Sequence, residues 1–122
     1  MRKELEERLI RYVISITKIC AELQPGFLAS HMSGQILRSA TSAALNYGEA
    51  QAAESRKDFI HKLSLVLKEL RETDVNLKIL SGGGLFNSPE RLNMVMDESN
   101  QLVSIFYRMV QTAKKKDEDV AK

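Results

Sequence analysis

The sequence predicts an all-α fold, an antiparallel up-down-up-down four-helix bundle. Three observations predict it: apolar residues recur at three- and four-residue steps along four long segments, no segment alternates as a strand does, and both prolines and a run of three glycines fall between the segments. Of its 122 residues, 43% are hydrophobic and 28% charged. A chain of this size has room for one core, so we expect a single domain over residues 1–122.

The first two helices are expected over residues 3–23 and 28–53. The first carries one apolar stripe and is followed by Pro25, which cannot continue a helix, and Gly26, which tolerates a turn. The inner stripe of the second comprises Ile36, Ala40, Ala43, Tyr47 and Ala50. Gly48 costs about 1 kcal/mol of helix stability relative to alanine, so we expect a close contact with a neighbouring helix at that position.

The third helix, residues 56–80, has the most regular stripe, and Ser55 is expected to cap its first turn. Its inner positions alternate steps of four and three at Phe59, Leu63, Val66, Leu70, Thr73, Leu77 and Leu80. The fourth helix, residues 90–115, follows Ser88 and Pro89 and has inner positions at Leu92, Val95, Ser99, Leu102, Phe106, Met109 and Ala113. The charged tail, residues 114–119, is expected to fray.

The residue patterns that carry most enzyme chemistry do not occur. A single cysteine, Cys20, excludes an internal disulfide and a cysteine-based zinc site. Neither His31 nor His61 follows a glutamate by three residues, as a di-iron bundle requires. The glycine run at 82–84 is not followed by the lysine and hydroxyl residue of a phosphate-binding loop. We therefore expect no enzyme: no catalytic residue, no metal, no cofactor and no small-molecule substrate.

The expected location is the cytoplasm. The first seven residues, MRKELEE, are charged and no apolar core follows them, unlike a secretory signal. The longest wholly apolar runs span only a few residues, which is too short to cross a membrane. We therefore expect no membrane partner.

Polar residues lie on or beside the stripes of the two middle helices, and we predict that they form a structural polar network: Arg38, Asn46, Glu49, Lys62 and Glu69. Buried charges must pair, because an unpaired one is strongly destabilising. We expect Arg38 or Lys62 to lie within salt-bridge reach of Glu49 or Glu69, so that the network fixes the register of the helices. The alternatives are a small polar pocket, which an enzyme could use around Glu49 and Glu69, or a subunit contact.

The third helix is also the most basic. Residues 55–80 carry six basic and four acidic side chains, against a net charge of +2 for the whole chain. The candidate nucleic-acid-binding residues are Arg56, Lys57, Lys68 and Lys78. A solvated helix face is the alternative explanation. If copies assemble in a ring, however, their charges sum to a strongly positive body that attracts phosphate backbones.

Four stretches of the two middle helices resemble a known family: RSATS at 38–42, NYGEA at 46–50, AESRKDFIHKL at 53–63 and LKELRET at 67–73. The family is that of four-helix bundle proteins encoded by intervening sequences in bacterial 23S rRNA genes, and the resemblance covers about residues 5–112. The same fold is similar to the accessory variability protein of diversity-generating retroelements, a ring-shaped pentamer with a basic surface that partners a reverse transcriptase and nucleic acid. The resemblance implies the bundle fold and a homo-oligomer, with a pentamer favoured.

One departure from the family pattern bears on mechanism. Relatives often carry an aromatic residue, typically tryptophan, shortly after the Arg-Glu-Thr element, where this chain has Asn76. The chain has no tryptophan and only seven phenylalanines and tyrosines, so we expect no aromatic platform for stacking bases. Contact with the nucleic-acid backbone is then the expected binding mode.

The sequence therefore predicts a non-enzymatic, self-assembling four-helix bundle that binds RNA or DNA through basic surfaces of the oligomer. The alternative is a structural or protein-adaptor module without nucleic-acid binding.

Overall fold

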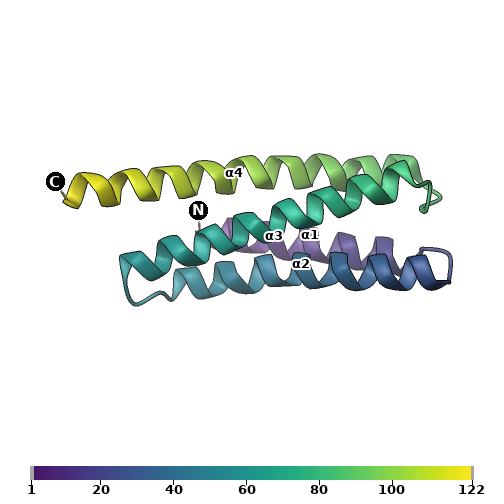
Figure 1. The fold of residues 1–122 in the computed structure, drawn as a ribbon, viewed down its shortest axis with the longest axis horizontal. Coiled ribbons are helices and arrows are strands. Elements are labelled where there is room, and N and C mark those ends of the chain that lie inside the picture. The colour runs from purple at the N-terminus through teal and green to yellow at the C-terminus, as the bar shows by residue number, and fades with distance from the viewer. Residues whose placement is uncertain (1, 122) are drawn as a thin grey trace.

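A computed structural model describes the backbone of residues 2–121 and the side chains of residues 3–119, and this part of the chain is four long helices joined by short turns (Figure 1). The helices are α1 (Arg2–Ala21), α2 (Phe27–Gln51), α3 (Arg56–Gly82) and α4 (Pro89–Ala121). Successive helices run in opposite directions (Figure 1). The predicted all-α, antiparallel four-helix bundle is confirmed.

The helices begin and end where side-chain capping and backbone conformation favour a turn. Ser55 caps α3, because its side-chain oxygen accepts a hydrogen bond from the Asp58 backbone N–H at 3.0 Å. Gly84 follows α3 with a φ of +65°, a left-handed conformation that glycine adopts without strain. α1 ends at Ala21 rather than at residue 23, because the next two N–H groups bond to carbonyls three residues back instead of four.

The charged tail differs from its prediction. Residues 114–119 were expected to fray, yet α4 continues through them to Ala121. Arg56 of α3 holds this part of α4, since its guanidinium donates to the Ala113 carbonyl at 3.1 Å and lies 3.6 Å from the Asp117 carboxylate. The expectation of fraying is wrong because a cation on the neighbouring helix anchors the tail.

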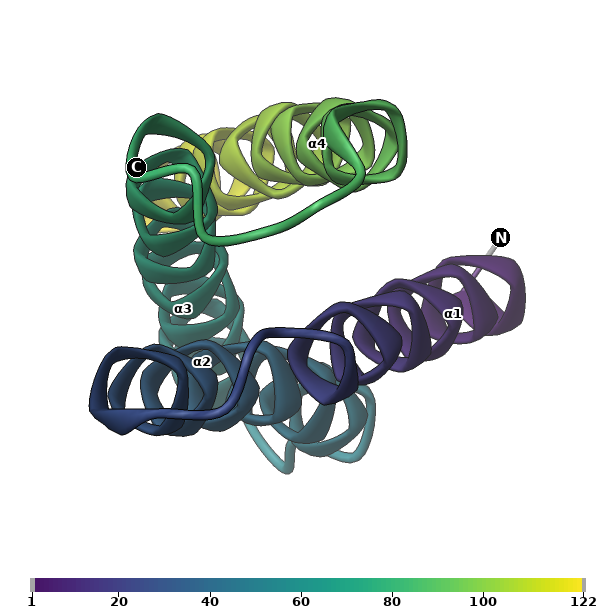
Figure 2. The ribbon, with the colours of Figure 1, turned by 90° about the vertical axis from the view of Figure 1, so that its right-hand side faces the viewer.

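The third helix lies between α2 and α4, while α1 packs mainly on α2 and meets α4 least (Figure 2). The α3 positions from Leu63 to Leu80 of the predicted stripe are buried, and only Phe59 is partly exposed. In α4 the core residue that follows Phe106 is Val110 rather than the predicted Met109, because the step from Phe106 is four residues rather than three. Met109 is partly exposed, and the predicted Ala113 is buried. The predicted stripes therefore form one shared core.

A buried polar contact and a surface ion pair join α1 to α4. The Tyr12 hydroxyl donates to the Ser99 hydroxyl at 2.7 Å, and both residues are buried. Burial raises the pKa of Tyr12 far above its usual value, which keeps the phenol neutral. One turn away, the Arg8 guanidinium donates two hydrogen bonds to the Glu98 carboxylate, at 2.7 and 2.8 Å.

The close contact expected at Gly48 is absent. A Cβ atom placed on Gly48 would have one neighbour, a carboxylate oxygen of Glu6 at 4.0 Å, and one placed on Gly34 would have none. Neither glycine of α2 is therefore required by helix packing within the chain.

Replacing the central leucine of α3 should destabilise the protein strongly. Leu70 is fully buried in the shared core, so Leu70→Ala should cost about 2 to 5 kcal/mol of unfolding free energy. Ile79→Ala on the exposed side of the same helix is the matched control and should cost much less. Urea unfolding at one protein concentration measures both, and a loss below about 1 kcal/mol for Leu70→Ala would show that the stripe is assigned wrongly.

Two glycine substitutions should change stability in opposite directions. Gly34→Ala should stabilise the protein by about 0.5 to 1 kcal/mol, because alanine favours the helix and the added methyl meets open space. Gly84→Ala should destabilise it, because alanine is strained at a φ of +65°. Thermal unfolding followed by circular dichroism compares the two, and a destabilising Gly34→Ala would contradict the open surface at that position.

Candidate functional site

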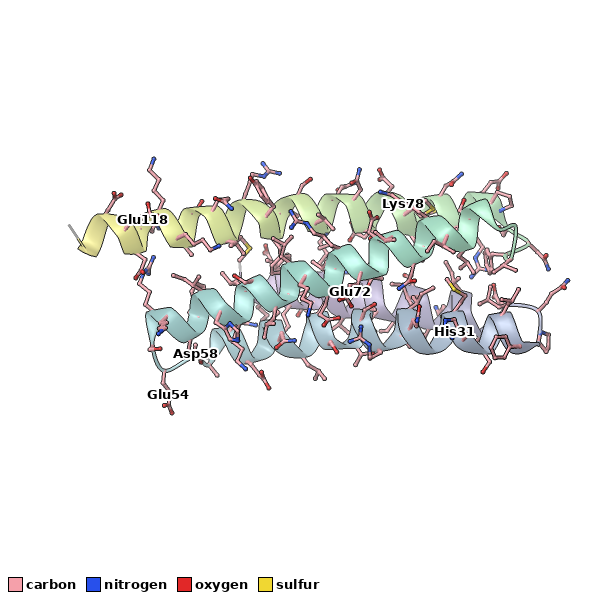
Figure 3. The ribbon with its side chains drawn as sticks, viewed as in Figure 1. His31, Glu54, Asp58, Glu72, Lys78 and Glu118 are labelled. Carbon is pink, nitrogen blue, oxygen red and sulfur yellow. The ribbon has the colours of Figure 1, made fainter. Side chains whose placement is uncertain are left out.

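The predicted polar residues form separate contacts between α2 and α3. One terminal nitrogen of Arg38 lies 3.2 Å from a Glu69 oxygen, and the other lies 2.7 Å from a Glu72 oxygen (Figure 3 labels Glu72 between α3 and α2). Further along, the Lys62 ammonium lies 2.9 Å from the Glu49 carboxylate. The structure thus brings the two predicted cations and the two predicted carboxylates together as two pairs.

These pairs lie at the surface rather than in the core. One partner of each pair is well exposed, Arg38 at 58% and Glu49 at 59%. The other partner is covered further, Glu69 to 12% and Lys62 to 26% exposure, so each pair lies at the solvent edge of the α2–α3 interface. The hydrogen bond to Glu72 and the charge of Glu69 raise the pKa of Arg38, and the hydrogen bond to Glu49 raises the pKa of Lys62. Exposed pairs of this kind contribute little to stability because water and salt screen them.

The buried polar link between α2 and α3 is a pair of hydroxyls. The side-chain oxygens of Ser39 and Thr73 lie 2.6 Å apart, and both residues are fully buried. The hydroxyl that accepts can donate to a carbonyl of its own helix, Ile36 for Ser39 or Glu69 for Thr73. Ser39 is one of six small residues at 39–44, and nothing in the sequence marks it as the one that faces Thr73.

Asn46 does not join this set. Its amide donates to the Ser42 carbonyl at 2.9 Å, within α2. Within the described residues, no group of three or more histidine, cysteine, aspartate or glutamate side chains could hold a metal ion. The polar residues of α2 and α3 therefore tie two helices together without forming a cluster of acids and bases.

Two of the four predicted basic residues form salt bridges with aspartates, and the other two do not. Arg56 contacts Asp117, and Lys78 lies 3.0 Å from Asp74 on its own helix (Lys78 is labelled in Figure 3). Lys57 and Lys68 are exposed and make no salt bridge to any described residue. They are 11 residues apart on one side of α3, which is about 16 Å along the helix axis.

The neighbouring helix α4 supplies basic residues that the sequence reasoning missed. Residues 99–116 contain no aspartate or glutamate, and their four cations are Arg108, Lys114, Lys115 and Lys116, all exposed. Residues 81–122 as a whole carry six basic and six acidic side chains, and this zero net charge hides the basic segment because the acidic residues lie before and after it. The charge distribution within these residues is the signal that could have revealed it.

Two contacts align the basic segments of α3 and α4. The Arg56 guanidinium, at the start of α3, donates a hydrogen bond to the Ala113 carbonyl of α4. The Arg71 guanidinium, further along α3, lies 5.8 Å from the centre of the Tyr107 ring of α4. Lys114 and Lys115 follow Tyr107 and Arg108 by seven residues, two turns along the same side of the helix. We call this surface the α3–α4 basic face and define it by Lys57, Lys68, Arg71, Arg108, Lys114 and Lys115.

No helix in the described part of the chain is long and apolar enough to cross a membrane. The family model described as 23S rRNA-intervening sequence protein matches residues 4–108. No curated protein matches the sequence.

A similar solved structure is the crystal structure of a protein with unknown function from the S23 ribosomal protein family of Bacteroides thetaiotaomicron. It is 30% identical, with a TM-score of 0.77, and the match covers 86% of this chain and 96% of that one. Neither comparison indicates an enzyme family. The match spans most of the chain, and the resemblance predicted from the sequence is confirmed: this chain belongs to the family of 23S rRNA-intervening sequence proteins.

Proposed function

We propose that this protein is a non-enzymatic, self-assembling bundle that binds the phosphate backbone of RNA or DNA through the α3–α4 basic face. One observation carries the proposal: the six cations of that face make no salt bridge to any described residue. Unpaired cations on two helices that contact each other are the electrostatic footprint expected of a backbone-binding surface. The protein acts in the cytoplasm in this proposal, without a membrane or small-molecule partner.

The original four candidates contribute unequally. Lys57 and Lys68 are free to meet phosphates, whereas Arg56 and Lys78 already face Asp117 and Asp74. Binding at the second pair would first require those carboxylates to be displaced. The main contribution therefore comes from Lys57 and Lys68 together with the α4 cations.

Self-assembly adds the affinity that one subunit lacks. A net charge of +2 attracts a polyanion weakly, but several copies in a ring present the basic face repeatedly and bind by multivalency. We favour a homopentamer, because the resemblance to the ring-shaped accessory variability protein of diversity-generating retroelements implies that state.

The surface of α1 and α2 supports a contact between copies. Ile10 and Ile14, one turn apart on α1, are 46% and 47% exposed, and Leu45 on the adjacent α2 is 65% exposed. Residues 27–48 of α2 contain a single charged side chain, Arg38. A nearly uncharged stretch of α2, together with exposed isoleucines on the otherwise charged α1, is suited to self-association. Contact there leaves the α3–α4 basic face open.

Reversing two free charges should abolish nucleic-acid binding. Lys57→Glu with Lys68→Glu should remove the retardation of a labelled RNA at about 50 mM salt, and the wild-type affinity should fall steeply between about 50 and 200 mM. Helical content and oligomeric state should stay unchanged, because both lysines are exposed.

The matched control places the same charge change on α1. Lys3→Glu with Lys18→Glu alters the net charge equally, at exposed positions away from the basic face, and should retain most of the binding. Because Lys18 lies one turn from Ile14, sedimentation velocity must show that this variant keeps the wild-type oligomeric state. Equal loss in both double variants would show that net charge rather than this face determines affinity. Undetectable binding by the wild type at low salt would refute the proposal and leave the structural or adaptor module in its place.

Charges placed on the α1–α2 surface should dissociate the oligomer. Ile14→Glu with Leu45→Glu buries carboxylates in the proposed contact, so sedimentation velocity should change from an oligomer to a monomer. Met94→Glu is the control, because Met94 is an exposed apolar residue of α4, and it should leave the oligomer intact. A wild type that sediments as a monomer would exclude self-assembly.

A further inference from the structure

Tyr107 differs from the other two tyrosines in its exposure. Tyr12 and Tyr47 are each 2% exposed, whereas Tyr107 is 47% exposed on the outer side of α4. It lies within the acid-free segment 99–116, next to Arg108. An aromatic ring is therefore open to solvent in the middle of the α3–α4 basic face, although the composition led us to expect no aromatic platform.

Arg71 of α3 lies over this ring. Its guanidinium carbon is 5.8 Å from the ring centre, within the range of a cation–π contact. No described carboxylate lies within salt-bridge distance of Arg71, so its guanidinium is not neutralised by an ion pair and faces the ring. A guanidinium and an aromatic ring both offer flat surfaces on which a nucleic-acid base can stack.

The pair borders a shallow surface hollow between α3 and α4, lined by Arg71, Val103, Ser104, Tyr107 and Arg108. Val103 and the tyrosine ring supply apolar surface, and Arg108 holds its own helix by donating to the Ser104 carbonyl at 3.4 Å. The terminal nitrogens of Arg108 donate no hydrogen bond to a described residue and are available to a phosphate or a base edge. The hollow thus combines a flat apolar element with cations on both helices.

We infer that the Arg71–Tyr107 pair stacks an unpaired base, so that the α3–α4 basic face prefers single-stranded RNA or DNA to a duplex. The inference rests on the proposed function, since the surrounding cations supply the backbone attraction. In a duplex each base is already stacked between its neighbours and offers no free face to the pair. In a single strand the base faces are free, and stacking adds affinity that does not depend on salt.

Fluorescence anisotropy with labelled probes tests the inference. The probes are an oligouridine, an oligodeoxythymidine and a mixed-sequence duplex, all matched in number of nucleotides. Tyr107→Leu, which keeps an apolar side chain but removes the ring, should weaken binding of the single strands by at least about fivefold. Binding of the duplex and the salt dependence should stay unchanged, and Tyr107→Phe should bind like the wild type.

Two further arms separate a stacking role from a purely structural or electrostatic one. Arg71→Lys keeps the positive charge but removes the planar guanidinium that stacks, so it should weaken single-strand binding without reducing the salt dependence. Lys68→Glu should weaken all three probes and reduce the salt dependence. The oligouridine and oligodeoxythymidine arms show whether RNA or DNA is preferred, and a similar loss on both supports stacking as the shared cause.

The outcomes distinguish the inference from the proposed function. Unchanged single-strand binding by Tyr107→Leu, with wild-type binding present and Lys68→Glu impaired, would overturn the stacking site and leave the proposed function standing. An equal loss on duplex and single strands would also overturn it. Absence of wild-type binding to every probe at low salt would overturn both. Thermal unfolding of each variant checks that the bundle is intact, as expected for exposed positions.

Discussion

The burial of the α3 apolar stripe between α2 and α4 is the constraint on which the rest of the structure depends. Residues from Leu63 to Leu80 along one side of α3 fill the shared core, so the opposite side of the same helix must face solvent. Lys57, Lys68 and Arg71 lie on that outer side. The packing that stabilises the bundle therefore also fixes where the basic residues are presented, and α4 adds its own cations beside them.

Polar contacts in this bundle differ in what they can fix. The buried Ser39–Thr73 and Tyr12–Ser99 hydroxyl pairs specify how α2 meets α3 and how α1 meets α4, because a buried hydroxyl without a partner is costly. Surface ion pairs such as Arg38 with Glu69 add little to this. Unpaired cations occur on α1 as well, at Lys3, Arg11 and Lys18. The α3–α4 basic face differs from α1 because it joins cations of two helices beside a segment of α4, residues 99–116, that has no acidic side chain.

The sequence was informative where one physical pattern dominates. Periodic burial predicted the four helices and nearly all of their inner positions, and the cap at Ser55 followed from local hydrogen bonding. The helical tail of α4 could not be predicted, because its anchor, Arg56, lies 57 residues away from Ala113 in the chain. Two of the four candidate binding cations are paired with carboxylates. The pairing of Lys78 with Asp74 could have been predicted from their four-residue spacing in one helix, whereas the pairing of Arg56 with Asp117 of another helix could not. The Arg71–Tyr107 contact also depends on the register of two helices, which periodicity leaves open.

The central claim is that nucleic acid contacts the outer side of α3 and α4. Acetylation of surface lysines, followed by mass spectrometry with and without oligouridine, tests it most directly, because each lysine reports its own accessibility. The account predicts that oligouridine protects Lys57, Lys68, Lys114 and Lys115 while Lys3 and Lys18 of α1 are modified at an unchanged rate. Protection of the α1 lysines with none on α3 and α4, or equal rates at every lysine despite binding, would contradict it.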